Sequence, residues 1–270
     1  MTTRAADGPE PTEPVRVERH GRTAVVTLDA PERRNVLSAA AVDAIGAAYD
    51  ALEADPEIAC VVLTGAGSAF CAGAELSVLE AAADGDFAPV RQVYDGFLRV
   101  LRSPLVTIAA VNGPAVGAGF NLALACDVRL AAASAVFDTR FAALGLHPGG
   151  GHTWLLTRVV GGQRATLATL FGETWDAHAA REHGLVAAVH ADDTLLAEAI
   201  ALGRRLDVHE PAYVRRLTTG LRLAAGPVGH AEVLAYEERA QAWSLTRPAF
   251  LGRLRELRER IARRAAQRSR

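Results

Sequence analysis

Residues 105–127, LVTIAAVNGPAVGAGFNLALACD, decide the fold that we predict for this chain. The apolar run Leu105–Val111 is short, continuous and rich in β-branched residues, which is typical of a strand buried in a parallel sheet. Asn112-Gly113-Pro114 then turns the chain, and a small apolar helix is expected from about Phe120 to Ala125. The uncharged run 104–126 is long enough to span a bilayer, but the turn in its middle favours a soluble core.

Gly117-Ala118-Gly119 lies just before this expected helix. A glycine-rich turn that enters a helix presents free backbone N–H groups, with the positive end of the helix dipole behind them. Such donors suit an oxygen atom that gains negative charge during a reaction. The segment therefore predicts an anion-stabilising site made of main-chain atoms.

Length and composition limit the class of protein. The 270 residues suffice for one large core, alone or with an appended helical segment. Half of the residues are hydrophobic and the formal net charge is −2, which disfavours a nucleic-acid binder and a disordered protein. Cys60, Cys71 and Cys126 lie in apolar runs and are odd in number, so we expect reduced thiols in a cytoplasmic protein. Residues 1–14 lack an apolar signal core and predict a disordered tail.

Strand and helix patterns alternate through the first three quarters of the chain. Strands are predicted at 15–18, 23–29, 58–63 and 128–132. Helices are predicted after Ser38, which caps the first one, and at about 90–101, 163–171 and 176–183. From about Asp193 onward the pattern is helical, with breaks at Pro211 and Pro227. We therefore predict an α/β core at 15–206 and a helical region at 207–270.

Several motifs follow one another along the chain: NVLS from Asn35, VVLTG from Val61, AFCAGAEL from Ala69, AVNGPAVGAG from Ala110, LGLHPGGG from Leu144, LTRVVG from Leu156 and HGLV from His183. Their order and spacing resemble the crotonase (enoyl-CoA hydratase/isomerase) superfamily over roughly residues 15–265. The resemblance implies a spiral of ββα turns, a C-terminal helical region that trimerises, and an acyl-CoA thioester as substrate without a separate cofactor. A homotrimer or homohexamer is the implied assembly. Apolar residues beyond Asp207 agree with it, because they are more numerous than a surface helix needs.

The resemblance also implies that two backbone N–H groups hold the thioester carbonyl as it becomes enolate-like. By motif position these groups belong to Ala74 and Ala118, both in glycine-flanked loops. In a water-poor site, one such donor is worth about 3–4 kcal/mol of transition-state stabilisation. The implied CoA contacts are Arg33, Arg34, Ala72, Gly73, Glu75, Leu76 and Gly117. A solvated loop charge is an equally good interpretation of the two arginines.

The chain departs from the hydratases of this superfamily at two positions. Those enzymes carry two glutamates that handle the water and the proton, and the matching residues here are Asn121 and Phe141. Neither side chain transfers a proton at neutral pH, and general acid–base groups supply about 10²–10⁴-fold each. We therefore expect hydration by the two-glutamate route to be badly impaired. An aspartate used by some isomerases and dehalogenases is matched by Gly149, so that route is also expected to be closed.

Other side chains near these motifs offer substitutes. His147 and His152 bracket the glycine run, and each is either an acid, base or orienting donor or a loop histidine bonded to the backbone. Asp138 is a second candidate, although an ion pair with Arg140 is the plainer expectation. Asn121 either binds substrate or water through its amide or only fills the space of the missing acid.

Further acids and thiols near the motifs are expected to be structural. Glu75 should stabilise its helix, while Glu80, Asp84 and Asp86 should lie in a solvated loop. Cys71 should be a buried thiol rather than a nucleophile. We expect no metal site, no nucleic-acid partner and no membrane segment.

Three functions remain open from the sequence. The first is an acyl-CoA enzyme that passes through an oxyanion-stabilised enolate. The second is a non-catalytic acyl-CoA binder. The third is a divergent reaction of the superfamily, namely decarboxylation, thioester hydrolysis or C–C cleavage, that uses His147 or Asp138.

Overall fold

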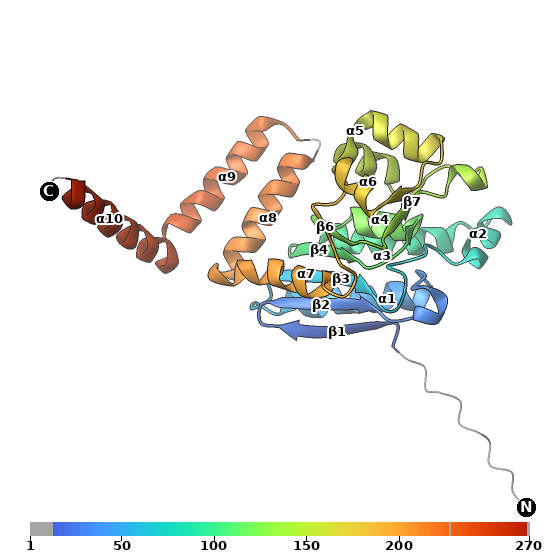
Figure 1. Cartoon of the computed structure of the whole chain (residues 1–270), viewed down its shortest axis with the longest axis horizontal. Helices are drawn as coiled ribbons and strands as arrows, with labels where there is room; N and C mark the ends of the chain where they lie inside the picture. Colours follow the sequence, from blue (N-terminus) through green and yellow to red (C-terminus); the bar gives the residue numbers. More distant parts are fainter. Residues whose placement is uncertain (1–12, 227, 269–270) are drawn as a thin grey trace, which may run out of the picture.

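A computed structural model describes residues 13–226 and 228–268 and has a mixed α/β architecture (Figure 1). The predicted α/β class is confirmed. Of the tail predicted at 1–14, residues 1–12 lie outside the described residues. Strand–helix units follow one another from β1 onward, and helices alone make up the chain beyond residue 194.

Six strands form the main sheet in the order β1-β2-β3-β4-β6-β9. Their bounds are Val15–His20, Thr23–Leu28, Cys60–Gly65, Val106–Val111, Val128–Ala132 and Ala188–His190. Strand β1 pairs antiparallel with β2, and the other neighbours are parallel. Every residue of β2 and β3 is buried, which explains why these strands are continuous apolar runs rather than alternating ones.

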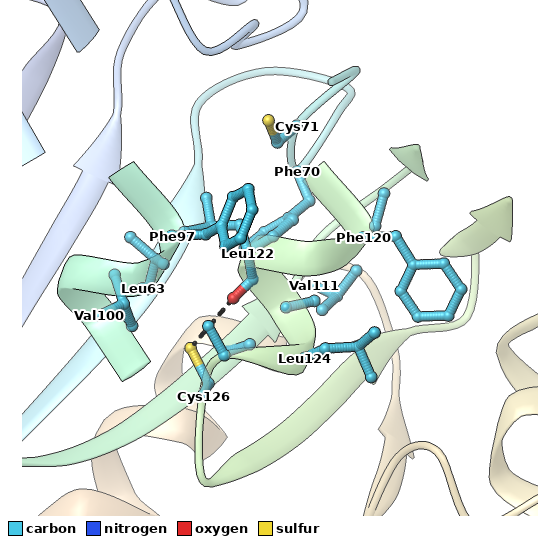
Figure 2. Close-up of a cluster of buried hydrophobic side chains, with 14 of the residues drawn as sticks. Leu63, Phe70, Cys71, Phe97, Val100, Val111, Phe120, Leu122, Leu124 and Cys126 are labelled. Atoms are coloured by element: carbon cyan, nitrogen blue, oxygen red, sulfur yellow. Dashed lines mark hydrogen bonds between the residues drawn. The ribbon is translucent and has the colours of Figure 1, made fainter. Parts of the chain in front are cut away.

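Helices cover both faces of the sheet. On one face, Val61 and Leu63 of β3 belong to the cluster packed by α1 (Ala39–Ala54), α3 (Ala88–Arg102) and α4 (Ala118–Leu124). Figure 2 shows Leu63 in this cluster with side chains of α3 and α4. On the other face, Cys60 and Val62 pack with α7 (Leu195–Arg204). The alternation along β3 buries both faces of the sheet.

A small second sheet joins β5 (Ala115–Val116), β7 (Val136–Asp138) and β8 (Trp175–Asp176). Strand β5 is the segment between the Asn-Gly-Pro turn and α4, and it pairs in parallel with β7 through Val116 and Asp138. This pairing fixes the start of α4 against the rest of the core.

Several helices differ from the sequence prediction. Helix α5 runs from His152 to Leu170, but the non-helical Gly161 (φ 77°) divides it into two parts, and the second part matches the helix predicted at 163–171. The part before Gly161 was not predicted, because the glycines on both sides of it resemble a loop. The predicted 176–183 helix is confirmed as α6 (Ala177–Glu182). Glu80 lies in helix α2 (Leu76–Ala83), not in the expected polar loop, since the alanine-rich segment favours a helix.

Three helices end the chain: α8 (Pro211–Ala225), α9 (His230–Leu245) and α10 (Pro248–Arg268). The predicted break at Pro211 is confirmed, while Pro227 lies outside the described residues. Helix α9 packs on α8, and α10 extends away from the core (Figure 1). Three short 3₁₀ helices, Pro31–Arg33, Ala142–Leu144 and Arg205–Val208, occur in loops.

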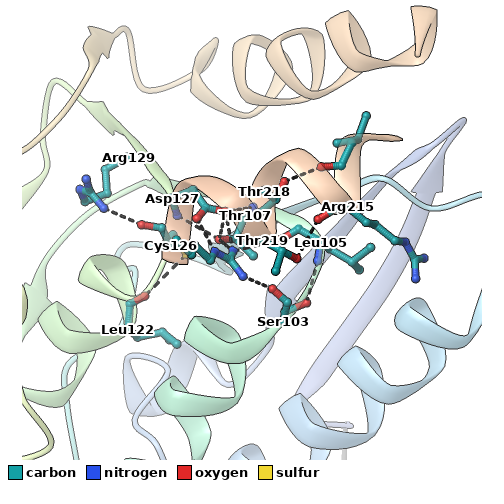
Figure 3. A network of polar contacts seen from close by, with 12 residues as sticks. Ser103, Leu105, Thr107, Leu122, Cys126, Asp127, Arg129, Arg215, Thr218 and Thr219 are labelled. Carbon is teal, nitrogen blue, oxygen red and sulfur yellow. Dashed lines mark hydrogen bonds and ion pairs between the residues drawn. The ribbon is translucent and has the colours of Figure 1, made fainter. Parts of the chain in front are cut away.

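Two arginines of α8 tie it to the core. Arg222 donates to both carboxylate oxygens of Asp127 at 2.7 and 2.6 Å and to the Leu105 carbonyl at 3.1 Å. Asp127 in turn accepts from the backbone and hydroxyl of Thr107 (Figure 3). Arg215 donates to the Glu53, Asp55 and Ile58 carbonyls. Helix α8 is therefore part of the same folded unit as the sheet.

In the part of the chain that the structure describes, no helix combines the length and apolar character needed to cross a membrane.

Candidate active site

The loops that follow β3 and β4 are joined by main-chain hydrogen bonds. The Cys71 N–H donates to the Pro114 carbonyl at 3.1 Å, and the Val116 N–H donates to the Cys71 carbonyl at 3.0 Å. Gly119 allows this approach, because a Cβ atom there would lie 2.0 Å from the Cys71 oxygen. The two glycine-containing motifs of the sequence are therefore held against each other.

Ala74 and Ala118 lie on these two joined loops. A Cβ atom on Gly73 (φ 103°) would lie 3.7 Å from the Ala118 nitrogen, so the segment before Ala74 lies against the start of α4. Ala118 is the first residue of α4, and its N–H has no acceptor within the helix. The Ala74 N–H donates to no other described residue. The segment before Ala74 and the start of α4 are therefore neighbours, and neither N–H donates to another described backbone group outside the helix.

Residues expected to contact CoA gather beside the Ala74 loop. Exposed Arg33 forms an ion pair with Glu75, the residue that precedes α2. The Ala72 N–H donates to the carbonyl of Arg34 at 3.0 Å, where the backbone is left-handed (φ 52°). Leu76 begins α2 and is 72% exposed.

Buried Asn35 holds the turn that contains Arg33 and Arg34. Its amide donates to the Ala66 and Ala69 carbonyls at 2.9 and 2.8 Å and accepts from the Ala30 N–H at 3.0 Å. Asn35, the first residue of the NVLS motif, therefore has a structural role. It connects the turn that contains Arg33 and Arg34 to the loop after β3.

Asn121 lies one turn beyond Ala118 in α4 and is completely buried. Its Nδ2 donates to the Gly149 carbonyl at 3.2 Å, and its Oδ1 lies 2.6 Å from Nδ1 of His152. Residues three apart on a helix share a face, so Asn121 lies on the side of α4 that presents Ala118. The amide connects α4 to the glycine run and to the first residue of α5.

His152 is buried as well, with 1% of its surface exposed. Its ring stands edge-on to Phe120 and Phe141, with ring centroids 5.7 and 5.1 Å away. Burial lowers the pKa of His152 to about 4, so the ring is neutral at pH 7. Its Nε2 has no hydrogen-bond partner among the described residues.

The other candidates lie in different surroundings. His147 is exposed, and its Nδ1 lies 2.7 Å from the carbonyl of the adjacent Pro148. Asp138 forms the expected ion pair with Arg140 at 2.6 Å and also accepts its backbone N–H at 2.7 Å. Asp84 and Asp86 are exposed in the turn after α2.

The three cysteines lie in the interior of the protein. All three thiols are unpaired and buried. Burial raises the pKa of Cys71 to about 12, which disfavours the thiolate and agrees with a structural role. No group of three or more histidine, cysteine or acidic side chains within the described residues is arranged to hold a metal ion.

Sequence reasoning missed one neighbour of the site. The hydroxyl of Tyr94, on α3, lies so close to the glycine run that a Cβ atom on Gly149 would be 1.9 Å from it. A Cβ atom on Gly150 would be 2.2 Å from the ring of Phe97. The consecutive glycines were the available signal, because they indicate a close approach of other atoms to the backbone.

Known proteins are similar to this chain in sequence and in architecture. Residues 18–243 match the enoyl-CoA hydratase/isomerase family. The probable enoyl-CoA hydratase EchA14 of Mycobacterium tuberculosis is 44% identical over 243 residues, which cover 88% of this chain and 94% of that protein. An enoyl-CoA hydratase structure from Bacillus anthracis superimposes with a TM-score of 0.84 at 29% identity, covering 92% of this chain and 96% of that one.

A Thermobifida fusca protein, solved in complex with acetoacetyl-CoA, is 33% identical with a TM-score of 0.76 over 86% of this chain and 95% of that one. The fold, the motifs and these matches lead to one conclusion. The chain belongs to the enoyl-CoA hydratase/isomerase family of enzymes.

Proposed function

We propose that this protein acts on an acyl-CoA thioester and holds the thioester oxygen between the N–H groups of Ala74 and Ala118. The observation that carries the proposal is the pair of free donors on two loops tied together at Cys71. Family membership and the acetoacetyl-CoA bound to the Thermobifida fusca relative support the choice of ligand. Two fixed donors stabilise the oxygen most when it carries enolate charge, so they lower the barrier to reaction at the neighbouring carbon.

The CoA arm is proposed to run past Ala72–Leu76 toward Arg33 and Arg34. Both arginines are exposed beside that segment, and guanidinium groups suit the phosphates of the nucleotide. Arg33 already pairs with Glu75, which keeps its charge near the loop.

The reaction is proposed to differ from ordinary two-glutamate hydration. By resemblance, Asn121 and Phe141 occupy the positions of the two glutamates. The side-chain amide of Asn121 is hydrogen-bonded to the Gly149 carbonyl and to His152. This internal bonding favours one alternative in particular, a protein that binds acyl-CoA without converting it. A divergent reaction that uses His147 or Asp138 is the other alternative, although the ion pair with Arg140 engages the aspartate.

The assembly is proposed to be a homotrimer or a homohexamer. Large apolar side chains of α8, α9 and α10 are at least 44% exposed in the single chain: Leu217, Leu221, Leu234, Leu245 and Leu251. A groove of about 470 Å³ between α8 and α9 is lined by residues of these two helices and contains none of the Ala74 loop. Burial of this surface against other copies would remove it from water.

Ala118→Pro tests the oxyanion proposal. Proline is tolerated at the first position of a helix, so the substitution removes the N–H with little effect on α4. Its kcat/KM on the best substrate in an acyl-CoA panel should fall about 10²–10³-fold while the melting temperature is kept. Unchanged kcat/KM would contradict the assignment.

Crotonyl-CoA, followed through its conjugated thioester absorbance, tests the reaction. Turnover at the rate of an ordinary hydratase would contradict the proposed loss of the two-glutamate route. Micromolar binding without conversion of any acyl-CoA in the panel would favour the non-catalytic function.

A further inference from the structure

The hydrogen bonds of Asn121 determine which nitrogen of His152 carries the proton. Nδ2 of the amide faces the Gly149 carbonyl, which can only accept, so the amide orientation is fixed and Oδ1 faces the ring. Because Oδ1 accepts, Nδ1 of His152 must donate. In the neutral ring, the lone pair is then left on Nε2.

This lone pair is buried without a partner. Nε2 of His152 accepts no hydrogen bond from any described residue, and the ring itself is nearly inaccessible. A buried acceptor without a donor destabilises the protein, and a ligand that brings a donor would recover that loss. Native proteins rarely leave such a group unpaired unless it serves a ligand or water.

The surroundings of the ring point to a small donor on the acyl group. Phe120 and Phe141 present their rings to His152, so its neighbourhood is apolar apart from Asn121. Asn121 in turn lies on the face of α4 that begins with Ala118, next to which the thioester oxygen is proposed to bind. An acyl chain attached to that thioester would continue toward Asn121 and His152.

We propose that Nε2 of His152 accepts a hydrogen bond from a hydroxyl group on the acyl chain of the thioester. The proposal rests on the proposed function, since the thioester brings the acyl chain to the histidine. It assigns this chain a preference for acyl groups that carry a hydroxyl donor. Phe141, in edge contact with the ring, would exclude bulk water from the bond.

Calorimetric binding of three ligands to the full chain tests the proposal. The ligands are butyryl-CoA and 3-hydroxybutyryl-CoA, each enantiomer separately, which differ only in the hydroxyl group. The wild-type protein should bind one hydroxylated enantiomer about tenfold more tightly than butyryl-CoA, as one hydrogen bond to a desolvated acceptor predicts. His152→Phe keeps an aromatic ring beside Phe120 and Phe141, and it should abolish the preference while binding butyryl-CoA within about twofold.

His178→Phe provides the matched control, because His178 is exposed on α6, and this variant should keep the preference. Should His152→Phe fail to fold, His152→Leu replaces it. Equal dissociation constants in the wild type, or a preference retained without His152, would overturn the proposal and leave thioester binding intact. Failure of all three ligands to bind would overturn the proposed function and this inference together.

Discussion

Nδ1 of His152 lies 2.6 Å from Oδ1 of Asn121, and this contact joins the first residue of α5 to the middle of α4. Both side chains are buried, so the bond forms away from water. It orients the histidine ring and leaves Nε2 buried without a partner, so a proton added to Nε2 would create a buried, unpaired charge. Protonation of His152 therefore opposes folding.

The stability of the protein should fall as the pH drops below 6.5. Burial lowers the pKa of folded His152 to about 4, while the unfolded residue titrates near 6.5. Between these two pH values the unfolded state binds more protons than the folded state. The stability that comes from keeping His152 neutral is therefore complete above pH 6.5 and is lost as the pH falls toward 4. We expect the free energy of unfolding, measured with urea, to fall between pH 7.5 and pH 4.5 by roughly 2 kcal/mol more in the wild type than in His152→Phe. An equal loss in both proteins would contradict this.

Gly119→Ala should separate the two loops of the site. The new Cβ atom would meet the Cys71 carbonyl at 2.0 Å, and a backbone oxygen cannot move aside as a flexible side chain can. We expect a loss of about 3 kcal/mol in the free energy of unfolding, measured by urea denaturation.

Gly46→Ala is the matched control for that variant. Gly46 lies inside α1 with no atom within 4 Å of the new Cβ, so alanine should stabilise the helix by up to about 1 kcal/mol. Equal effects of the two substitutions would show that the close contact at Gly119 has no energetic importance.

Arg222→Met should loosen α8 from the core. The substitution keeps much of the side-chain length but leaves Asp127 without its guanidinium partner. Since both side chains are about one quarter exposed, we expect a moderate loss of about 1–3 kcal/mol in urea unfolding. Arg263→Met, in an exposed ion pair of α10, should change stability by less than about 0.5 kcal/mol. Similar losses in both variants would contradict the anchoring role of Arg222.

Aspartates on the exposed face of α8 should disrupt the proposed assembly. Leu217 and Leu221 are one helical turn apart and are 51% and 65% exposed in the single chain. Multi-angle light scattering should give a trimer or hexamer for the wild type and a monomer for Leu217→Asp with Leu221→Asp. Leu196→Asp, on the exposed side of α7, should keep the wild-type mass. A monomeric wild type would refute the proposed assembly.

The sequence correctly predicted those elements in which the apolar pattern and the residues at the ends indicate the same structure. Strand β4 follows from its β-branched run, and the first helix begins at Ser38, whose hydroxyl accepts the Ala41 N–H at 3.2 Å as a capping residue should. The start of α5 was missed because three glycines precede it and two more interrupt it. Local patterns indicate a break at such residues even where the surrounding core supports a helix.

The proximity of the Ala74 and Ala118 loops came from family resemblance, since local periodicity carries no information about long-range contacts. For the same reason, the sequence did not separate His147 from His152. Only the packing of α4 against α5 buries one histidine on Asn121 and leaves the other in solvent.

The bond between the Cys71 carbonyl and the Val116 N–H joins two peptide groups and uses no side-chain atom. Replacing the polar residues around it leaves those peptide groups in place. A chain with this architecture can therefore exchange its acids, amides and histidines over evolutionary time while the joined backbone of the two loops, here called the frame, would still orient a substrate. Chemical change among its relatives should concentrate in the side chains that face the frame, while the glycines that permit it stay the same.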